Sequence, residues 1–314
     1  MMDRDLPDLG DVEAAARRIG AHVRRTPSYE VRPGLWFKLE LLQHSGSFKA
    51  RGAFNRILSA REQGELPAAG VIVASGGNAG LGVAYAAGQL GVPAEVFVPQ
   101  NAPATKVTRL RDLGAVVHQH GREYAEAYAA SAIRAAETGA LFVHAYDQPE
   151  IVAGQGTMAL ELPEADTVLV ATGGGGLVGG VQVALAGKAR VIAVEPAGAP
   201  TLHAALAAGG PVDVPIDTVA GDSLGAHRIG AIAYSLAIHH GTESLLVSDA
   251  AIIAARLRLW QEHRIVVEHG AAAAFAALDA GVHVPAAGER VVVVLCGANT
   301  DPATLHAETA HATG

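Results

Sequence analysis

The sequence predicts an α/β protein in which helices cover both faces of parallel sheets. Short runs that are apolar throughout alternate with longer amphipathic or alanine-rich stretches, as expected for strands that are buried on both faces. The composition agrees, because 314 residues that are 50% hydrophobic and 17% charged can form the large core of a globular enzyme.

Strands and helices alternate along the first half of the chain. The predicted strands are LWFKLE (35–40), VIVA (71–74), AEVFVP (94–99) and AVVH (115–118). Each is followed by a stretch of helical length, at 48–59, 78–90, 104–113 and 123–137.

The second half continues this alternation. Its predicted strands are TVLVAT (167–172), RVIAVE (190–195), SLLVS (244–248) and RVVVVLC (290–296). The helices that follow them are predicted at 177–186, 201–208, 249–263 and, as a last short helix, from about Pro302.

Charge and cysteine content exclude several classes of protein. A net charge of −8 provides no electrostatic surface for nucleic acid or for an anionic membrane. The longest uncharged stretch, 167–187, is interrupted by glycines and does not predict a membrane span. Because Cys296 has no partner for a disulfide and the N-terminus MMDRDLPDLG does not resemble a secretory signal, we expect a cytoplasmic protein.

The first chemically informative cluster is SGSFKARG (45–52), which follows a strand and opens a helix. We expect the ammonium of Lys49, between Phe48 and Ala50, to be desolvated and to face the positive end of the helix. Both effects favour the neutral amine, which is the nucleophilic form. A solvated surface position is the commoner fate of a lysine, and that alternative stays open.

The second cluster is SGGNAG (75–80), where a strand meets a helix. Backbone N–H groups at the helix N-terminus, with the side chains of Ser75 and Asn78, predict an anion site suited to a carboxylate. In an isolated segment of this kind, capping of the helix by Asn78 is the commoner role.

The third cluster is TGGGGL (172–177), again between a strand and a helix. Four successive glycines indicate that a ligand lies directly against the backbone, and a phosphate is the natural guest. However, Gly174, Gly176 and Gly179 also fit the dinucleotide pattern G-x-G-x-x-G, with Glu195 at about the distance of a ribose-binding acid. The segment alone does not distinguish a nicotinamide cofactor from a simple phosphate group.

The fourth cluster is LCGAN (295–299), at the carboxyl end of the most hydrophobic strand, where ligands bind in parallel sheets. A lone buried cysteine is more often a small core residue. The histidine pairs at 118 and 120 and at 239 and 240 lack acidic or cysteine partners at metal spacing, so no transition-metal site is predicted.

Together the clusters describe one ligand, with an aldehyde for Lys49, a phosphate for the glycine loop and a ring nitrogen for Cys296. This ligand is pyridoxal phosphate, which handles amino acids. The segments occur in the order SGSFKARG, SGGNAG, TGGGGLVGG, VEPAGA, DSLGAHRIG, VVEHGAAAAFAAL and VVVLCGAN. In this order they resemble the fold-type-II pyridoxal phosphate enzymes, the tryptophan synthase β-like family, and within it the L-serine/L-threonine dehydratases of the serine dehydratase type.

The resemblance covers nearly the whole chain and implies two three-layer αβα domains with the cofactor in the cleft between them. The large cofactor-binding domain would comprise residues 1–43 and 147–314, and the small substrate-closing domain residues 44–146. A homodimer is also implied.

The resemblance further implies roles for individual residues. Lys49 would form the Schiff base with the cofactor, Asn78 would bind its phenolic oxygen, and Cys296 would meet its pyridine nitrogen. Phe48 would flank one face of the cofactor ring, and Ser223 would cover the other face. The phosphate would be bound by Gly173, Gly174, Gly175, Gly176 and Leu177. The substrate carboxylate would be held by Ser75, Gly76, Asn78 and Ala79.

Glu195 has a second reading in this family, which competes with ribose binding. With backbone oxygens of Ala199, Leu224 and Ala226, it falls where these dehydratases carry a monovalent cation such as K⁺. Gly76 stands where racemases of the family have a serine, so we expect little or no racemase activity. Ser223 and His269 depart from the usual family pattern.

The implied reaction is β-elimination from L-serine and/or L-threonine, giving pyruvate or 2-oxobutanoate plus ammonia. One alternative is the same chemistry on another 3-hydroxy amino acid, such as 3-hydroxyaspartate or phenylserine. A nicotinamide-dependent oxidoreductase is a second alternative, but it leaves SGSFKARG unexplained. A binding protein that keeps the cofactor without turnover is the third.

Overall fold

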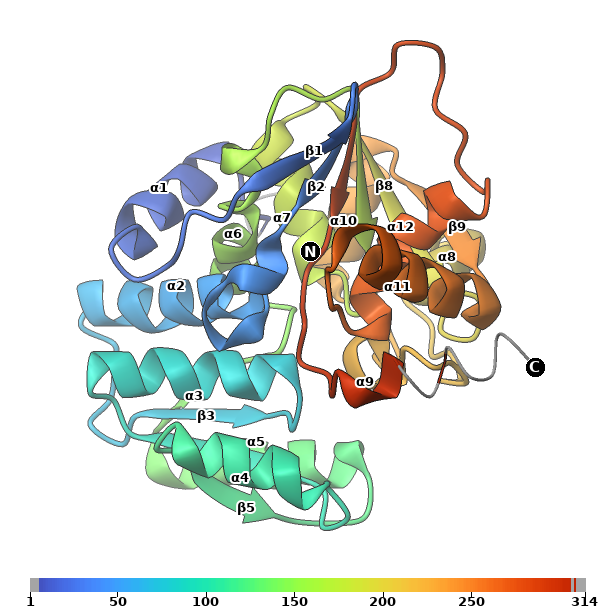
Figure 1. Cartoon of the computed structure of the whole chain (residues 1–314). Helices are drawn as coiled ribbons and strands as arrows, with labels where there is room; N and C mark the ends of the chain where they lie inside the picture. Colours follow the sequence, from blue (N-terminus) through green and yellow to red (C-terminus); the bar gives the residue numbers. More distant parts are fainter. Residues whose placement is uncertain (1–5, 306–307, 309–314) are drawn as a thin grey trace.

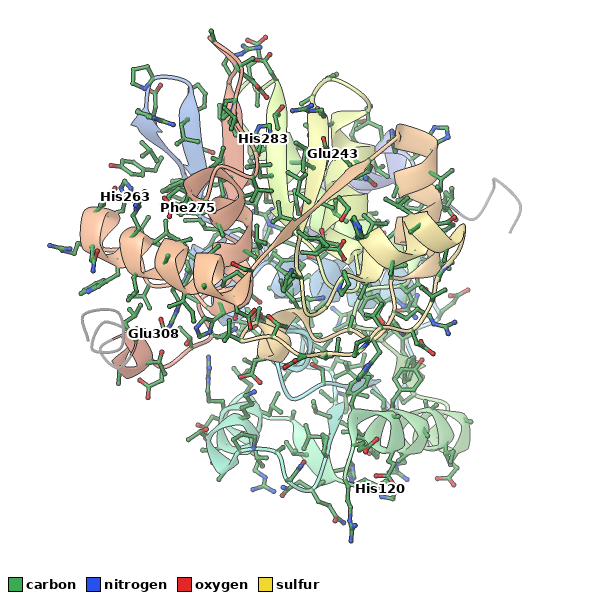
Figure 2. All side chains as sticks on the ribbon, turned by 90° about the vertical axis from the view of Figure 1, so that its right-hand side faces the viewer. His120, Glu243, His263, Phe275, His283 and Glu308 are labelled. Atoms are coloured by element: carbon green, nitrogen blue, oxygen red, sulfur yellow. The ribbon has the colours of Figure 1, made fainter. Side chains whose placement is uncertain are left out.

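The computed structural model describes residues 6–305 and 308, and it contains two sheets in two lobes (Figure 1). In Figure 2 the lower lobe carries His120, and the upper lobe carries Glu243 and His283. The strands of the larger sheet are β1 (Ser28–Arg32), β2 (Leu35–Lys38), β7 (Thr167–Ala171), β8 (Arg190–Pro196), β9 (Glu243–Val247) and β10 (Val291–Val294). Those of the smaller sheet are β3 (Val71–Ala74), β4 (Ala94–Val98), β5 (Val116–Gln119) and β6 (Leu141–Phe142).

The larger sheet has the order β1-β2-β10-β7-β8-β9, and its pairs from β2 to β9 are parallel. Strand β1 is the exception to the predicted parallel arrangement, because it pairs antiparallel with β2. Only Pro33 and Gly34 separate the two strands, and Gly34 has a φ of +84°, which glycine adopts without strain. A connection this short can join only antiparallel neighbours.

The smaller sheet has the order β5-β4-β3-β6 and is parallel throughout. One face packs against helices α3 (Asn78–Leu90) and α4 (Ala104–Asp112), with α2 (Lys49–Glu62) packed on α3, and the other face packs against α5 (Tyr124–Thr138). The residues of β3 explain this arrangement, because Val71 and Val73 face one helical layer while Ile72 and Ala74 face the other.

Helices also cover both sides of the larger sheet. Figure 1 shows α11 (Asp249–His263) and α12 (His269–Asp279) on one side, and α1 (Leu9–Ile19), α6 (Pro149–Gly156) and α7 (Gly176–Leu185) on the other. The remaining helices of this lobe are α8 (Thr201–Ala208), α9 (Gly221–Leu224) and α10 (Ala231–His240). Phe37 of β2 meets His263 and Phe275 edge-on, with ring centroids 5.3 and 5.2 Å apart, which fixes α11 and α12 on the sheet.

All eight predicted strands lie in the two sheets, and the predicted helices match α2, α3, α4, α5, α7, α8 and α11 to within a few residues. Of the predicted last helix, Pro302 lies in a turn, residues 303–305 are helical, and the later residues except Glu308 lie outside the described residues. The helix α12 was not among the predicted elements, because its alanine-rich sequence is buried all round and shows no amphipathic pattern. The domain boundaries at residues 43/44 and 146/147 stay a prediction.

Helix α2 lies between the lobes and is anchored by a buried ionic network. Arg51 donates from Nε to Oε1 of Glu40 at 2.5 Å and from Nη1 to Oε1 of Glu161 at 2.8 Å. Lys38 donates to Oε2 of Glu161 at 2.6 Å. Arg51, Glu40 and Lys38 are almost completely buried, so each charge depends on these partners. Within the described residues, no helix is both long and apolar enough to cross a membrane.

Arg51→Met is expected to lower the free energy of unfolding of the apo-protein by about 3–5 kcal/mol, because it leaves the carboxylate of Glu40 buried without its cation. Arg61→Met, at an exposed position of the same helix, is the control and should cost less than about 1 kcal/mol. Urea unfolding measures both values. Equal losses in the two variants would show that the network does not hold α2.

Candidate active site

The four sequence clusters meet in two adjoining cavities. Every residue predicted to hold the cofactor lines the inner cavity: Phe48, Lys49, Asn78, Gly173, Gly174, Gly175, Gly176, Leu177, Ser223 and Cys296. The outer cavity measures about 680 Å³ and is lined by the predicted carboxylate site, Ser75, Gly76, Asn78 and Ala79. Lys49 and Asn78 line both cavities, so the reactive amine lies where the two meet.

Lys49 is the first residue of α2, and its amine points into the site. Nζ donates a hydrogen bond to the backbone oxygen of Ala145 at 2.7 Å and lies 4.9 Å from the ring centroid of Phe48. Burial lowers the pKa of Lys49 to about 8, and the nearby acidic groups Cys296 and Glu268 oppose this shift only in part. The amine is therefore far more available for covalent chemistry than an exposed lysine.

The glycine loop has no room for side chains. A Cβ at Gly174 would lie 2.3 Å from a ring carbon of Tyr146, and one at Gly176 would lie 2.8 Å from the backbone oxygen of Tyr146. Gly175 has a φ of +87°, and a Cβ there would lie 2.5 Å from Ala233. Gly175 also caps α7 without a side chain, so the first N–H groups of this helix are available to an anion.

The second predicted anion site, for a carboxylate, lies at the N-terminus of α3. Its cap is Gly77, and the Asn78 side chain does not cap the helix, so the capping interpretation of Asn78 is wrong. Instead, Asn78 Nδ2 donates to Oε1 of Glu268 at 2.7 Å. Gly80 allows the loop to fold onto the helix, because a Cβ there would lie 1.9 Å from the backbone oxygen of Ser75.

Cys296 follows strand β10 and is held against the lysine segment. Its backbone oxygen accepts a hydrogen bond from the N–H of Phe48 at 3.1 Å, and Ser47 forms a bridge with Gly297. Burial raises the pKa of the Cys296 thiol, so the group stays neutral near neutral pH. A neutral thiol is a weak hydrogen-bonding partner that does not draw a proton onto a ring nitrogen.

These groups fit pyridoxal phosphate. The partly buried amine of Lys49 suits its aldehyde, the glycine loop at the start of α7 suits its phosphate, and Cys296 and Asn78 are among the polar groups that line the same narrow cavity. The three functions lie in one cavity, as one small ligand requires.

Glu195 lies deeper, and its carboxylate faces α8 and β9. It accepts hydrogen bonds from Leu202 N at 2.7 Å, His203 N at 2.9 Å and Ser244 Oγ at 2.6 Å. Thr201 Oγ1 joins it to the glycine loop, with 3.0 Å to Glu195 and 2.6 Å to the backbone oxygen of Gly173. Because the carboxylate is fully buried behind the loop, it cannot bind a ribose, and the nicotinamide interpretation fails.

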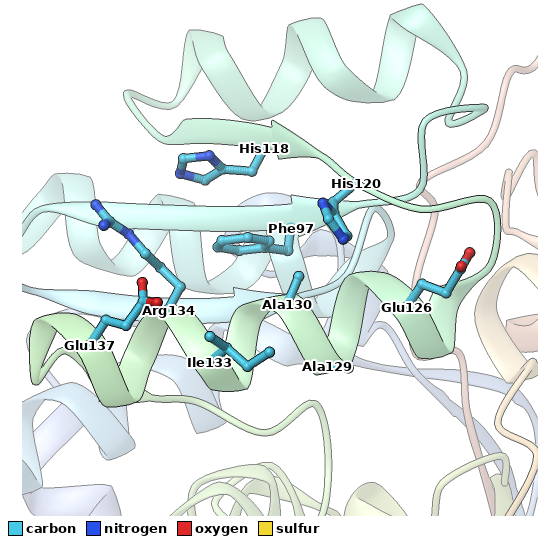
Figure 3. A pocket seen from close by; sticks show the side chains of 9 residues that line it. All are labelled: Phe97, His118, His120, Glu126, Ala129, Ala130, Ile133, Arg134 and Glu137. Atoms are coloured by element: carbon cyan, nitrogen blue, oxygen red, sulfur yellow. The ribbon is translucent and has the colours of Figure 1, made fainter.

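A third hollow, of about 750 Å³, lies on the outer face of the smaller sheet (Figure 3). His118 stacks on Phe97 there, with centroids 4.5 Å apart, and pairs with Glu95 at 2.6 Å. Arg134 donates to the same carboxylate. These groups satisfy one another, and within the described residues no cluster of histidine, cysteine or acidic side chains is placed to hold a metal ion.

The sequence did not single out three residues of the site. Glu268 precedes α12 and is buried beside Lys49, and Tyr146 forms the wall shared by both cavities. Asn299 donates from Nδ2 to Oδ1 of Asn78 at 2.6 Å. Glu268 and Asn299 lie in the motifs VVEHG and LCGAN, but the sequence does not show that these two motifs lie close together in the fold.

The fold and the site define a pyridoxal phosphate enzyme of fold type II. A family model described as pyridoxal-phosphate dependent enzyme matches residues 19–297, and the chain belongs to this family. It is 38% identical over 308 residues to the L-threonine ammonia-lyase of Geobacter sulfurreducens, covering 94% of this chain and 76% of that protein. It is 39% identical over 316 aligned residues to the phenylserine dehydratase of Ralstonia pickettii, covering 96% and 95%. Among solved structures, maize serine racemase matches with a TM-score of 0.88 and 30% identity over 98% of each chain.

Burial raises the pKa of Glu268 to about 7, although the hydrogen bond from Asn78 opposes the shift. Between about pH 4.5 and pH 7 the folded apo-protein therefore keeps a proton on Glu268 that the unfolded chain has lost. Ionisation of this group favours the unfolded chain, so the free energy of unfolding falls as the pH rises through that range. Relative to Glu268→Gln, the wild type should lose up to about 3 kcal/mol across the range, measured by urea unfolding.

The control for this titration is Glu262→Gln, at a carboxylate that is exposed on α11. Its stability should follow the wild type at every pH. A difference between the wild type and Glu268→Gln that stays constant with pH would contradict the assignment of the proton to Glu268.

Proposed function

We propose that the protein is a pyridoxal phosphate-dependent ammonia-lyase that converts L-serine to pyruvate and L-threonine to 2-oxobutanoate, with release of ammonia. The observation that carries the proposal is the partly buried Lys49 amine between a glycine loop suited to a phosphate and a helix N-terminus suited to a carboxylate. The similarity to proteins named L-threonine ammonia-lyase supports the choice of substrate.

Pyridoxal phosphate supplies an aldehyde that binds the substrate amine and a ring that accepts the electron pair left when the α-proton departs. In this proposal Lys49 first holds the cofactor and then, as a free amine, removes the α-proton. Ser75, Asn78 and the backbone N–H groups of Gly76 and Ala79 bind the carboxylate and orient the α-carbon toward Nζ. The 3-hydroxyl would then leave with a proton as water, and the released enamine would take up one water to give the 2-oxo acid and ammonia.

The proposal also includes a cation site, a cellular location and an oligomeric state. A monovalent cation would lie beside Glu195. The contacts of Thr201 with Glu195 and with the backbone oxygen of Gly173 would connect this cation site to the glycine loop. Its other ligands would be backbone oxygens of Ala199, Leu224 and Ala226. We also propose a cytoplasmic homodimer. Racemisation is not proposed, because Gly76 has no side chain to deliver a proton.

An aryl substrate such as phenylserine is a second candidate, and one observation favours it. Aromatic side chains line the outer cavity in a continuous series, namely Tyr124, Tyr128, His144 and Tyr146. The ring centroid of Tyr128 lies 6.1 Å from that of Tyr124 and 5.9 Å from that of His144. The ring centroids of His144 and Tyr146 are 4.7 Å apart. The side chain of threonine cannot fill such a space, whereas a phenyl ring would stack on its walls.

The test of the function uses the purified protein with pyridoxal phosphate. It should be yellow, and borohydride should attach the cofactor to Lys49, as located by peptide mass spectrometry. Lys49→Ala should lose this label and at least about 10³-fold in kcat/KM, because it removes the nucleophile and the base together. Lys106→Ala, at the other lysine of the outer cavity, should keep the label at Lys49.

The substrates to compare are L-serine, L-threonine, 3-hydroxyaspartate and 3-phenylserine, with 2-oxo acid formation as the readout. Turnover of threonine and serine supports the first candidate, and preferential turnover of phenylserine supports the second. A yellow protein that is inactive on all four would favour a binding protein. A colourless protein that binds NADH would overturn the proposal.

Cys296→Asp is expected to slow deamination of L-threonine about ten-fold or more, or to open side reactions, because a carboxylate favours a protonated ring nitrogen. Cys296→Ser, which keeps a neutral group of similar size, is the control. The measurements are the rate of 2-oxobutanoate formation and a chromatographic product profile. An unchanged rate and product profile in Cys296→Asp would refute the role given to the thiol.

A further inference from the structure

A continuous chain of hydrogen bonds crosses the cleft beside the inner cavity. Arg109 Nη2 donates to Oδ1 of Asn299 at 2.7 Å, and Asn299 Nδ2 donates to Oδ1 of Asn78 at 2.6 Å. Asn78 Nδ2 then donates to Oε1 of Glu268 at 2.7 Å. The side chains alternate between the lobes, because Arg109 and Asn78 lie on α4 and α3, whereas Asn299 and Glu268 follow β10 and precede α12.

The two ends of this chain fix its direction. A guanidinium can only donate hydrogen bonds, and an ionised carboxylate can only accept them. A side-chain amide has an oxygen that accepts and an NH₂ group that donates, and unless its partners prevent it, the amide can turn over so that these two groups exchange places. Arg109 therefore holds the oxygen of Asn299, which leaves its Nδ2 for Asn78. When Glu268 is ionised, it holds Nδ2 of Asn78, so that neither amide can turn over without placing two donors or two acceptors against each other.

The backbone around the chain is shaped to admit it. A Cβ at Gly46 would lie 2.6 Å from Oδ1 of Asn299, and one at Gly297 would lie 2.5 Å from Oε1 of Glu268. Asn299 Nδ2 also donates to the backbone oxygen of Ser45 at 2.9 Å. The glycines of two sequence clusters thus make room for these side chains as well as for a ligand.

Only one of the two Nδ2 hydrogens of Asn78 is used by Glu268. Asn78 is nine-tenths buried and lines the inner cavity, where a ligand is the remaining partner for the second hydrogen. A turned amide would offer its oxygen at the same place. For an anionic oxygen in the cavity, that change replaces an attractive hydrogen bond with a repulsive contact between two oxygens.

We propose that Arg109, Asn299 and Glu268 are positioning residues that lock the Asn78 amide with an N–H toward the phenolic oxygen of pyridoxal phosphate. This inference rests on the proposed function. It adds that the lock spans both lobes, and that it depends on the surface residue Arg109, which touches neither cavity.

Asn299→Asp tests the lock most directly, because aspartate has the shape of asparagine but, when ionised beside Arg109, only accepts hydrogen bonds. It cannot donate to Oδ1 of Asn78, and it competes with Glu268 for Nδ2. We expect the dissociation constant for pyridoxal phosphate, from titration of the apo-protein, to rise about ten-fold or more. The absorption maximum of the bound cofactor should shift as well. The titration is run at about pH 8.5, where Glu268 is ionised.

Arg109→Met tests the distant end of the chain without touching either cavity. It should weaken cofactor binding several-fold and shift the absorption maximum in the same direction as Asn299→Asp, and Arg109→Lys should restore both in part. Arg111→Met, at an exposed position of the same helix, is the matched control and should bind as the wild type does. Melting temperatures of the apo-proteins identify any variant that is misfolded. If Asn299→Asp is misfolded, the comparison of Arg109→Met with Arg109→Lys decides.

The outcomes separate this inference from the proposed function. If the wild type binds the cofactor and deaminates threonine while Asn299→Asp and Arg109→Met match it in affinity and absorption, the inference is wrong and the function stands. A melting temperature that falls without a change in affinity or absorption would likewise overturn the inference. A wild type that does not bind pyridoxal phosphate would overturn both.

Discussion

The buried pairing of Arg51 with Glu40 is the interaction on which the site depends, because Arg51 and Lys49 lie in the same helical turn. Arg51 faces the larger lobe, where Glu161 joins it to Lys38 of strand β2. Lys49 faces the cleft. The ion pairs that anchor α2 to the larger sheet therefore also set the position of the reactive amine. Because Arg51, Glu40 and Lys38 are buried, loss of one partner would leave buried charge without compensation.

Burial also explains the electrostatics of the site. Burial lowers the pKa of Lys49 and raises those of Glu268 and Cys296, so all three groups shift toward their neutral forms. A carboxyl group whose pKa is about 7 beside an amine whose pKa is about 8 gives a site whose charge changes within the physiological range. Fixed hydrogen bonds then decide where the remaining charge is placed, as Asn78 does for Glu268.

The glycines serve close packing in two different ways. In the loop before α7 they bring backbone against Tyr146 and Ala233, so that the start of the helix offers N–H groups in place of side chains. At Gly46 and Gly297 they admit the side chains of Asn299 and Glu268 into the cleft. The first use concerns a ligand, and the second concerns the residues that orient Asn78.

The sequence by itself determined the α/β class, the eight strands named from it, and the four clusters, because apolar strands and glycine loops are local patterns. It also indicated the unusual environment of Lys49, since an apolar helix start is local as well. Only the tertiary structure decided that β1 runs antiparallel, that Glu195 is buried behind the glycine loop, and that Asn78 binds Glu268 although 190 residues separate them. The physical reason is that hydrogen bonds and desolvation depend on which groups the fold brings together, and residue spacing does not record those contacts.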